Sequence, residues 1–135
     1  MITVENQLFS LHTRHTSYLF RVMATGHLEH LYYGRKIHPA IDGLMEQHAF
    51  APGNTNIYDS EHLQFSLEDA CLEMSSFGKG DIREPFVELT LSDGSETSDF
   101  LFEKFEQGTG KEEFETLPGS YDESGEVEWL GVTLS

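Results

Sequence analysis

The sequence is poor in the features that mark secreted or membrane-bound proteins. Cys71 is its only cysteine, so no disulfide can form within the chain, and this favours a reducing compartment such as the cytoplasm. It has no run of about 18 apolar residues, and no basic segment followed by an apolar run opens the chain. We therefore expect neither a transmembrane helix nor a secretory signal peptide.

Basic residues are also scarce. The chain has 8 Lys and Arg against 24 Asp and Glu, which gives a net charge of −16 at pH 7. Residues 1–50 hold four acids and four bases, whereas residues 51–135 hold the other 20 acids and only four bases. Such a surface repels phosphate groups, which argues against nucleic acids and anionic membranes as partners. The simplest role of this acidity is solubility.

The motifs of common catalytic and cofactor sites are missing. The chain has no G-x-S-x-G nucleophile elbow, no G-x-x-x-x-G-K-[ST] phosphate loop and no H-E-x-x-H zinc motif. His12 and His15 are three residues apart, as are His27 and His30, and in a strand this spacing directs the two rings to opposite faces. We expect surface and turn histidines, solvated acidic residues, and no metal or cofactor.

What the sequence does contain is short runs of alternating apolar and polar residues. Turn residues separate these runs, a pattern that is typical of strands. The first runs predict an antiparallel meander, and the clearest strand signal is 86–96, where Asp93 and Gly94 mark a hairpin turn. One short helical turn is expected in residues 39–50. The predicted strands lie at residues 2–4, 8–13, 17–23, 27–34, 61–69, 86–96, 99–110 and 126–135. This pattern indicates an all-β fold, an antiparallel β-sandwich.

One stretch, SFGKGDIREP, has the composition of a shaped loop that enters a strand. Gly78 and Gly80 permit positive φ and a tight loop. Asp81 can bond to turn backbone, and the planar donors of Arg83 suit carboxylates or vicinal hydroxyls. Phe77 supplies a flat face on which a sugar ring can stack. Two interpretations remain open: a ligand-binding loop, or a loop whose charged residues only attach it to the next strand.

Four blocks of the chain together resemble the N-terminal region of bacterial α-galactosidases of glycoside hydrolase family 36. LYYGRKI at 31–37 is similar to a segment H-L-Y-Y-G-K-x-I of that family. Residues 65–85 resemble a block that ends in Y-G-x-G-D-F-R-x-P. Residues 87–106 match a strand, a DGS turn and a return strand, and residues 117–134 match an L-P-x-x-Y loop followed by a strand. The order and spacing of the blocks fit over nearly the whole chain.

The resemblance implies that residues 1–135 are the first part of an N-terminal β-supersandwich in a longer enzyme. Family members remove terminal α-linked galactose from oligosaccharides such as melibiose and raffinose, with retention. Their two catalytic aspartates lie on a (β/α)₈ barrel, which this chain is too short to contain. We therefore expect the chain to be non-catalytic by itself. A last predicted strand that runs to the end of the sequence agrees with a leading piece of a longer protein.

The resemblance also implies a role in assembly. Many family members are homotetramers in which a loop of this domain reaches the mouth of a neighbouring subunit's active site. The residues that would form this rim in the present chain are Glu68, Phe77, Asp81 and Arg83.

Two alternatives from other classes stay open at this point. The chain could be a self-standing β-sandwich carbohydrate-binding module, or an acidic interaction domain without a ligand. We also expect the isolated chain to self-associate, because a partial sandwich leaves apolar surface uncovered.

Overall fold

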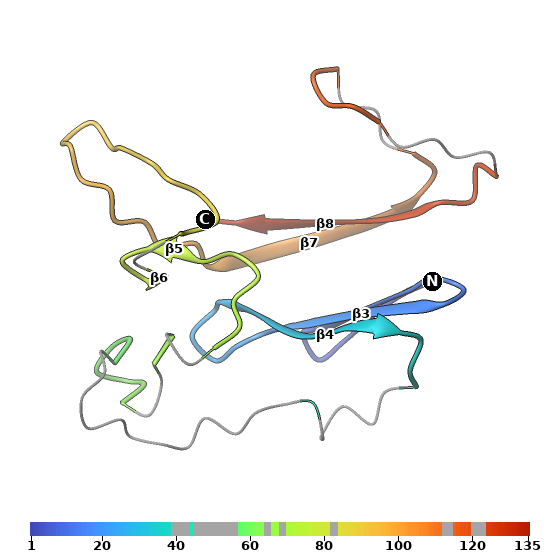
Figure 1. Cartoon of the computed structure of the whole chain (residues 1–135), viewed down its shortest axis with the longest axis horizontal. Coiled ribbons are helices and arrows are strands. Elements are labelled where there is room, and N and C mark those ends of the chain that lie inside the picture. The colour runs from blue at the N-terminus through green and yellow to red at the C-terminus, as the bar shows by residue number, and fades with distance from the viewer. Residues whose placement is uncertain are drawn as a thin grey trace.

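A computed structural model describes residues 1–38, 44, 57–63, 66–67, 70–81, 84–111, 115–119 and 124–135. Its named elements are all strands (Figure 1). They are β1 (Ile2–Glu5), β2 (Leu8–His12), β3 (Thr16–Val22), β4 (Leu28–Arg35), β5 (Ser76–Phe77), β6 (Gly80–Asp81), β7 (Phe102–Thr109) and β8 (Glu128–Leu134). In the described ranges, no helix is both long enough and apolar enough to cross a membrane.

The first sheet is the expected meander, with strand order β1-β2-β3-β4 and antiparallel pairing throughout. Asn6 and Gln7 connect β1 to β2 with φ values of 49° and 62°, the left-handed conformation of a two-residue hairpin turn. A bulge between Leu19 and Phe20 shifts the register of β3 against β4. The alternation of the sequence and its polar turns therefore predict this sheet correctly.

A second layer, formed by the antiparallel pair β7–β8, lies over the first sheet and closes the core (Figure 1). The rings of Phe9 and Phe20 stack with their centroids 4.7 Å apart, and Phe105 meets Phe9 edge-on at 5.4 Å. Apolar side chains from both layers pack around this stack, namely Val4, Leu11, Tyr18, Val22, Leu28, Phe102, Leu130, Val132 and Leu134. The prediction of an all-β sandwich is confirmed.

Residues 86–96, the clearest strand in the sequence, do not form one. Val87 makes a single parallel bridge to Ser76, and no strand is assigned from there to Phe102. The Asp93–Gly94 turn is present, since the Leu91 N–H donates to the Ser95 carbonyl at 2.8 Å. A strand needs a hydrogen-bonded partner as well as an alternating pattern, and the described part of the chain supplies none here.

Two other expectations concern the segment between β4 and β5. The predicted strand at 61–69 is wrong for residues 61–63 and 66–67, which lie outside strands, and its other residues are not described. The expected helical turn at 39–50 lies outside the described residues except for residue 44.

A short segment does extend the first sheet. It forms a bridge between Glu29 and Leu72, the His30 N–H donates to the Cys71 carbonyl at 2.7 Å, and the Glu73 N–H donates to the Leu28 carbonyl at 2.9 Å. Residues 71–73 therefore run antiparallel beside β4, and they lead directly into the loop that begins at Ser76.

Candidate functional site

The glycine-rich loop folds as a compact turn between two very short strands. Phe77 in β5 pairs with Asp81 in β6, and Ser76 bridges to Lys79. Gly78 has φ 78°, and a Cβ at this position would lie 3.4 Å from the side chain of Thr97. The expected positive φ is therefore confirmed at Gly78, where an L side chain would be strained.

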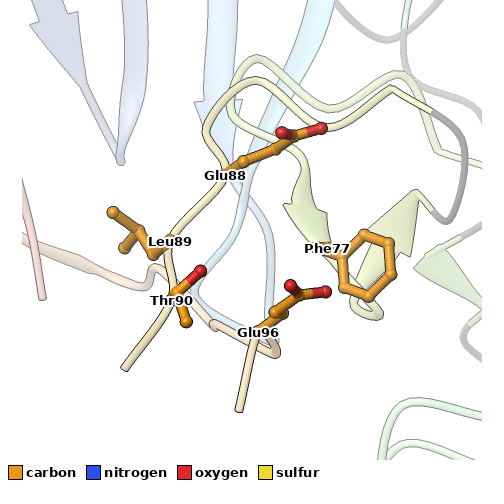
Figure 2. Close-up of a pocket in the computed structure, with 5 residues that line it drawn as sticks. All are labelled: Phe77, Glu88, Leu89, Thr90 and Glu96. Carbon is orange, nitrogen blue, oxygen red and sulfur yellow. The ribbon is translucent and has the colours of Figure 1, made fainter. Parts of the chain in front are cut away.

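A pocket of about 300 Å³ opens beside this loop (Figure 2). Its lining residues come from β5 and from the two legs of the excursion around the Asp93–Gly94 turn. They are Phe77, Glu88, Leu89, Thr90 and Glu96. In Figure 2 the Glu96 carboxylate points toward the Phe77 ring, whereas the Leu89 side chain points away from it. The volume is at the lower end of the range for small-molecule sites, roughly 300–1,000 Å³.

The chemistry of this pocket fits a polyhydroxylated ligand. Phe77 offers an aromatic face, the carboxylates of Glu88 and Glu96 accept hydrogen bonds, and the Thr90 hydroxyl both donates and accepts. Hydroxyl groups need such acceptors, and the apolar face of a sugar ring needs a flat apolar partner. The described part of the chain contains no cluster of three or more His, Cys, Asp or Glu that could hold a metal ion.

A hydrogen-bond network centred on Asp99 lies beside the loop. His27 Nε2 lies 2.9 Å from Asp99 Oδ1, the Tyr58 hydroxyl donates to Asp99 Oδ2 at 2.8 Å, and Thr25 Oγ1 lies 2.9 Å from His27 Nδ1. Lys79 Nζ lies 3.9 Å from Asp99 Oδ2 and 5.0 Å from the centroid of the Tyr58 ring. The network thus joins the loop to the β3–β4 turn and to two segments distant in sequence.

The environment of Tyr58 reflects this arrangement. Burial raises the pKa of Tyr58 to about 12, and the hydrogen bond to Asp99 and the negative charges of Asp99 and Asp59 add to the shift. Its ring also meets the ring of His27 edge-on at 4.8 Å. The expectation that the histidines lie at the surface is wrong for His27, which is 2% exposed, because Asp99 and Thr25 satisfy both of its ring nitrogens.

A second attachment fixes the chain just before the loop. His30 Nδ1 lies 2.6 Å from a carboxylate oxygen of Glu73. Burial, together with the hydrogen bond and the charge of Glu73, raises the pKa of Tyr18 well above its ordinary value. The Glu73 carboxylate therefore ties residues 71–73, just before the loop, to both β3 and β4.

The structure describes only part of the predicted rim. Phe77 lines the pocket. Asp81 is placed as a β6 residue, but its side chain, like Glu68 and Arg83, lies outside the described parts of the chain.

Sequence reasoning missed the other four lining residues, Glu88, Leu89, Thr90 and Glu96. The available signal was the polar face of the segment predicted as a strand, because Glu88 and Thr90 alternate with apolar residues there.

Comparison with known proteins identifies the family. The model of the glycosyl hydrolase family 36 N-terminal domain matches residues 26–135. The chain belongs to this family. The resemblance inferred from the sequence blocks is therefore confirmed.

Two relatives show how much of such proteins the chain covers. It is 30% identical to the bifunctional alpha-galactosidase/sucrose kinase AgaSK of Mediterraneibacter gnavus, over 96% of this chain and 14% of the relative. It is 29% identical to alpha-galactosidase Mel36A of Lactobacillus acidophilus, over 96% of this chain and 18% of the relative. The chain therefore spans less than a fifth of the length of these relatives.

Solved structures of α-galactosidases also match nearly the whole of this chain to less than a fifth of their own length. The galactosidase domain of AgaSK superposes with a TM-score of 0.86 at 30% identity, over 100% of this chain and 19% of that one. The alpha-galactosidase of Lactobacillus brevis gives a TM-score of 0.84 at 31% identity, over 96% of this chain and 18% of that one. A variant of AgaA from Geobacillus stearothermophilus, in complex with raffinose, gives a TM-score of 0.83 at 25% identity, over 94% of this chain and 18% of that one.

Proposed function

We propose that this chain is the leading, non-catalytic part of a retaining α-galactosidase that removes terminal α-linked galactose from raffinose- or melibiose-type oligosaccharides. Family membership and the α-galactosidase relatives support this proposal, as does the raffinose bound to a variant of AgaA. The hydrolysis uses water and needs no cofactor. The single cysteine agrees with a cytoplasmic location.

Within that enzyme, we propose that the chain takes part in oligomer assembly and that its Phe77 loop shapes the rim of a neighbouring subunit's active site. The observation that carries this proposal is the position of Phe77, on a firmly held turn beside an open pocket that also contains carboxylates and a hydroxyl. Glu68, Asp81 and Arg83 are proposed to add hydrogen bonds to the sugar.

The support of the loop matters for such a role. A contact residue contributes most when it is ordered before the ligand arrives, because less conformational entropy is then lost on binding. Lys79 Nζ lies 3.9 Å from Asp99 Oδ2, the Thr97 side chain lies beside Gly78, and Glu73 fixes the residues before the loop. We infer that the two attachments preorganise Phe77 for contact with a sugar ring beyond the galactose that is cleaved.

The test is a comparison of two substrates with the full-length enzyme that carries this chain. We expect Phe77→Ala to lower kcat/KM for a raffinose-type trisaccharide roughly 5- to 30-fold, which corresponds to about 1–2 kcal/mol for a buried aromatic contact. An aryl α-galactoside, which has no further sugar ring, should lose less than about twofold.

The matched control is Leu117→Ala, which truncates an exposed apolar residue that does not line the pocket. It should leave both substrates unchanged. Equal losses on both substrates for Phe77→Ala would point to a general structural defect, and no loss on either would refute the rim role.

A further inference from the structure

The chain contains a single tryptophan, Trp129, which lies on the outer face of the second layer. Leu130 and Val132 of β8 pack into the core, and side chains alternate along a strand, so Trp129 points away from the core. Its partner across the β7–β8 pair is Gly108. In Figure 1 the first sheet lies on one side of this pair, and among the described residues no strand covers the other side.

The indole ring lies across the surface of this pair, over two glycines. A Cβ at Gly108 would lie 2.7 Å from Cε2 and Cζ2 of Trp129 and 2.8 Å from its Nε1, so any side chain at position 108 would collide with the ring. A Cβ at Gly131 would lie 3.6 Å from Cζ3, on the opposite edge of the ring. The ring therefore rests on the backbone and turns its other face outward, and Trp129 is half-buried.

Polar side chains continue this face along the two strands. Glu106 pairs with Gly131, and Lys104 pairs with Thr133. Lys104, Glu106 and Thr133 are exposed, and Gly131 between them raises no side chain. We call these residues, Lys104, Glu106, Trp129, Gly131 and Thr133, the outer platform. The indole N–H has no hydrogen-bond partner within the described ranges, so it adds a donor beside the ring.

The outer platform has the chemistry of a carbohydrate-binding surface. The exposed face of an indole can stack on the C–H face of a sugar ring, and the carboxylate, ammonium and hydroxyl groups beside it can pair with sugar hydroxyls. From Trp129 to Thr133 a strand advances about 13 Å, at about 3.4 Å per residue, which leaves room for more than one sugar ring. The net charge of −16 disfavours anionic glycans.

We propose that the outer platform is a second carbohydrate-binding surface, which holds a neutral glycan that bears galactose. One galactose stacks on Trp129, because its axial 4-hydroxyl leaves an unbroken C–H surface on the other ring face. The sugars that follow lie over Gly131, toward Lys104 and Thr133. This surface shares no residue with the Phe77 pocket, and it holds a glycan without cleaving it, so it goes beyond the proposed function. Two separate contacts with one glycan raise the effective concentration of the sugar at each.

The emission of Trp129 tests this proposal directly, because no other tryptophan contributes to it. Stachyose is titrated into the 135-residue chain while tryptophan fluorescence is recorded. Native electrophoresis in gels with and without galactomannan then measures how strongly a galactose-bearing polymer retards the chain. We expect a saturable change in emission with stachyose, and slower migration in the gel that contains galactomannan.

The substitution Gly131→Thr separates binding from folding. A Cβ at this position meets ordinary contacts of 3.6 and 3.9 Å, and threonine is well accommodated in strands, but its side chain stands beside the indole where the next sugar would lie. We expect stachyose binding to weaken more than about fivefold, with Tm unchanged to within about 2 °C.

Two aromatic substitutions complete the test. Trp129→Ala removes the stacking face and should weaken retention by galactomannan more than about tenfold, because tryptophan is among the residues that carry most binding energy. The control is Tyr33→Ala, which truncates another exposed aromatic residue, on the first sheet, and should leave retention unchanged.

Failure is distinguishable from failure of the proposed function, because no hydrolysis is measured and the Phe77 pocket contains no tryptophan. Emission that stachyose does not change at any concentration would overturn the inference, even with slower migration in galactomannan, since the polymer would then bind elsewhere. A folded Gly131→Thr chain that binds stachyose like the unmodified chain would also overturn it.

Discussion

The Asp99 network makes a quantitative prediction for the substitution Asp99→Asn. Asn has nearly the same size, but it has one acceptor oxygen where Asp has two. His27 Nε2 and the Tyr58 hydroxyl each use a different oxygen of Asp99, so only one of them keeps an acceptor. The other faces the Asn amide NH₂, which is a donor, so its own proton loses its acceptor in a partly or fully buried position.

The cost follows from the burial of these groups. A buried donor without an acceptor destabilises a fold by about 1–3 kcal/mol. The Lys79 contact to Asp99 is longer, at 3.9 Å, and both side chains are partly exposed, so its loss adds little. For a chain of this size we expect a fall in Tm of roughly 3–10 °C.

Thermal unfolding followed by far-UV circular dichroism measures the effect. The matched control is Asp93→Asn, because Asp93 is an exposed aspartate that accepts hydrogen bonds from the N–H and the side chain of Ser95, and the Asn oxygen can accept them too. The control should unfold like the unmodified chain. If Asp99→Asn also keeps the original Tm to within about 1 °C, the network does not support the fold in the way described.

Three further predictions concern the same scaffold. The pKa of the Tyr58 hydroxyl is raised to about 12 in the fold and is about 10 in an unfolded chain. The contribution of Tyr58 to the free energy of unfolding is therefore complete below about pH 10 and is lost as the pH rises from about 10 to about 12. Tyr58→Phe should flatten this part of the pH profile measured by urea denaturation. Gly78→Ala should cost about 1–2 kcal/mol in urea denaturation, because φ is 78° there. Phe9→Ala, which removes a fully buried ring stacked on Phe20, should cost about 3–5 kcal/mol; a smaller loss would contradict the description of the core.

The first sheet could be predicted from local sequence because its signals are local. Each strand alternates, each is joined to the next by a short turn, and neighbours in sequence are neighbours in space. Asn6 and Gln7 adopt the conformation that a two-residue hairpin turn requires. The last strand was predictable for the same reason, since Leu130, Val132 and Leu134 alternate toward the core.

The lack of a strand at residues 86–96 could not be predicted in this way. Residues 86–96 alternate as a strand does, but strand formation depends on a partner, and alternation alone does not supply one. The burial of His27 was equally hidden, because its partner Asp99 is 72 residues away in sequence. The pocket residues Glu88 and Glu96 come together only through the turn between them, so their convergence on Phe77 is a property of the tertiary fold.

The most direct test of the central claim asks whether the Phe77 loop acts on a neighbouring subunit. One enzyme variant carries Phe77→Ala with an intact catalytic barrel, and a second carries an inactive barrel with Phe77 intact. The two are dissociated, mixed and reassembled, and hydrolysis of a raffinose-type trisaccharide is measured. We predict that the mixed oligomers exceed the sum of the separate activities, because intact loops then face intact barrels. An activity equal to that sum would contradict a rim built from the neighbouring subunit.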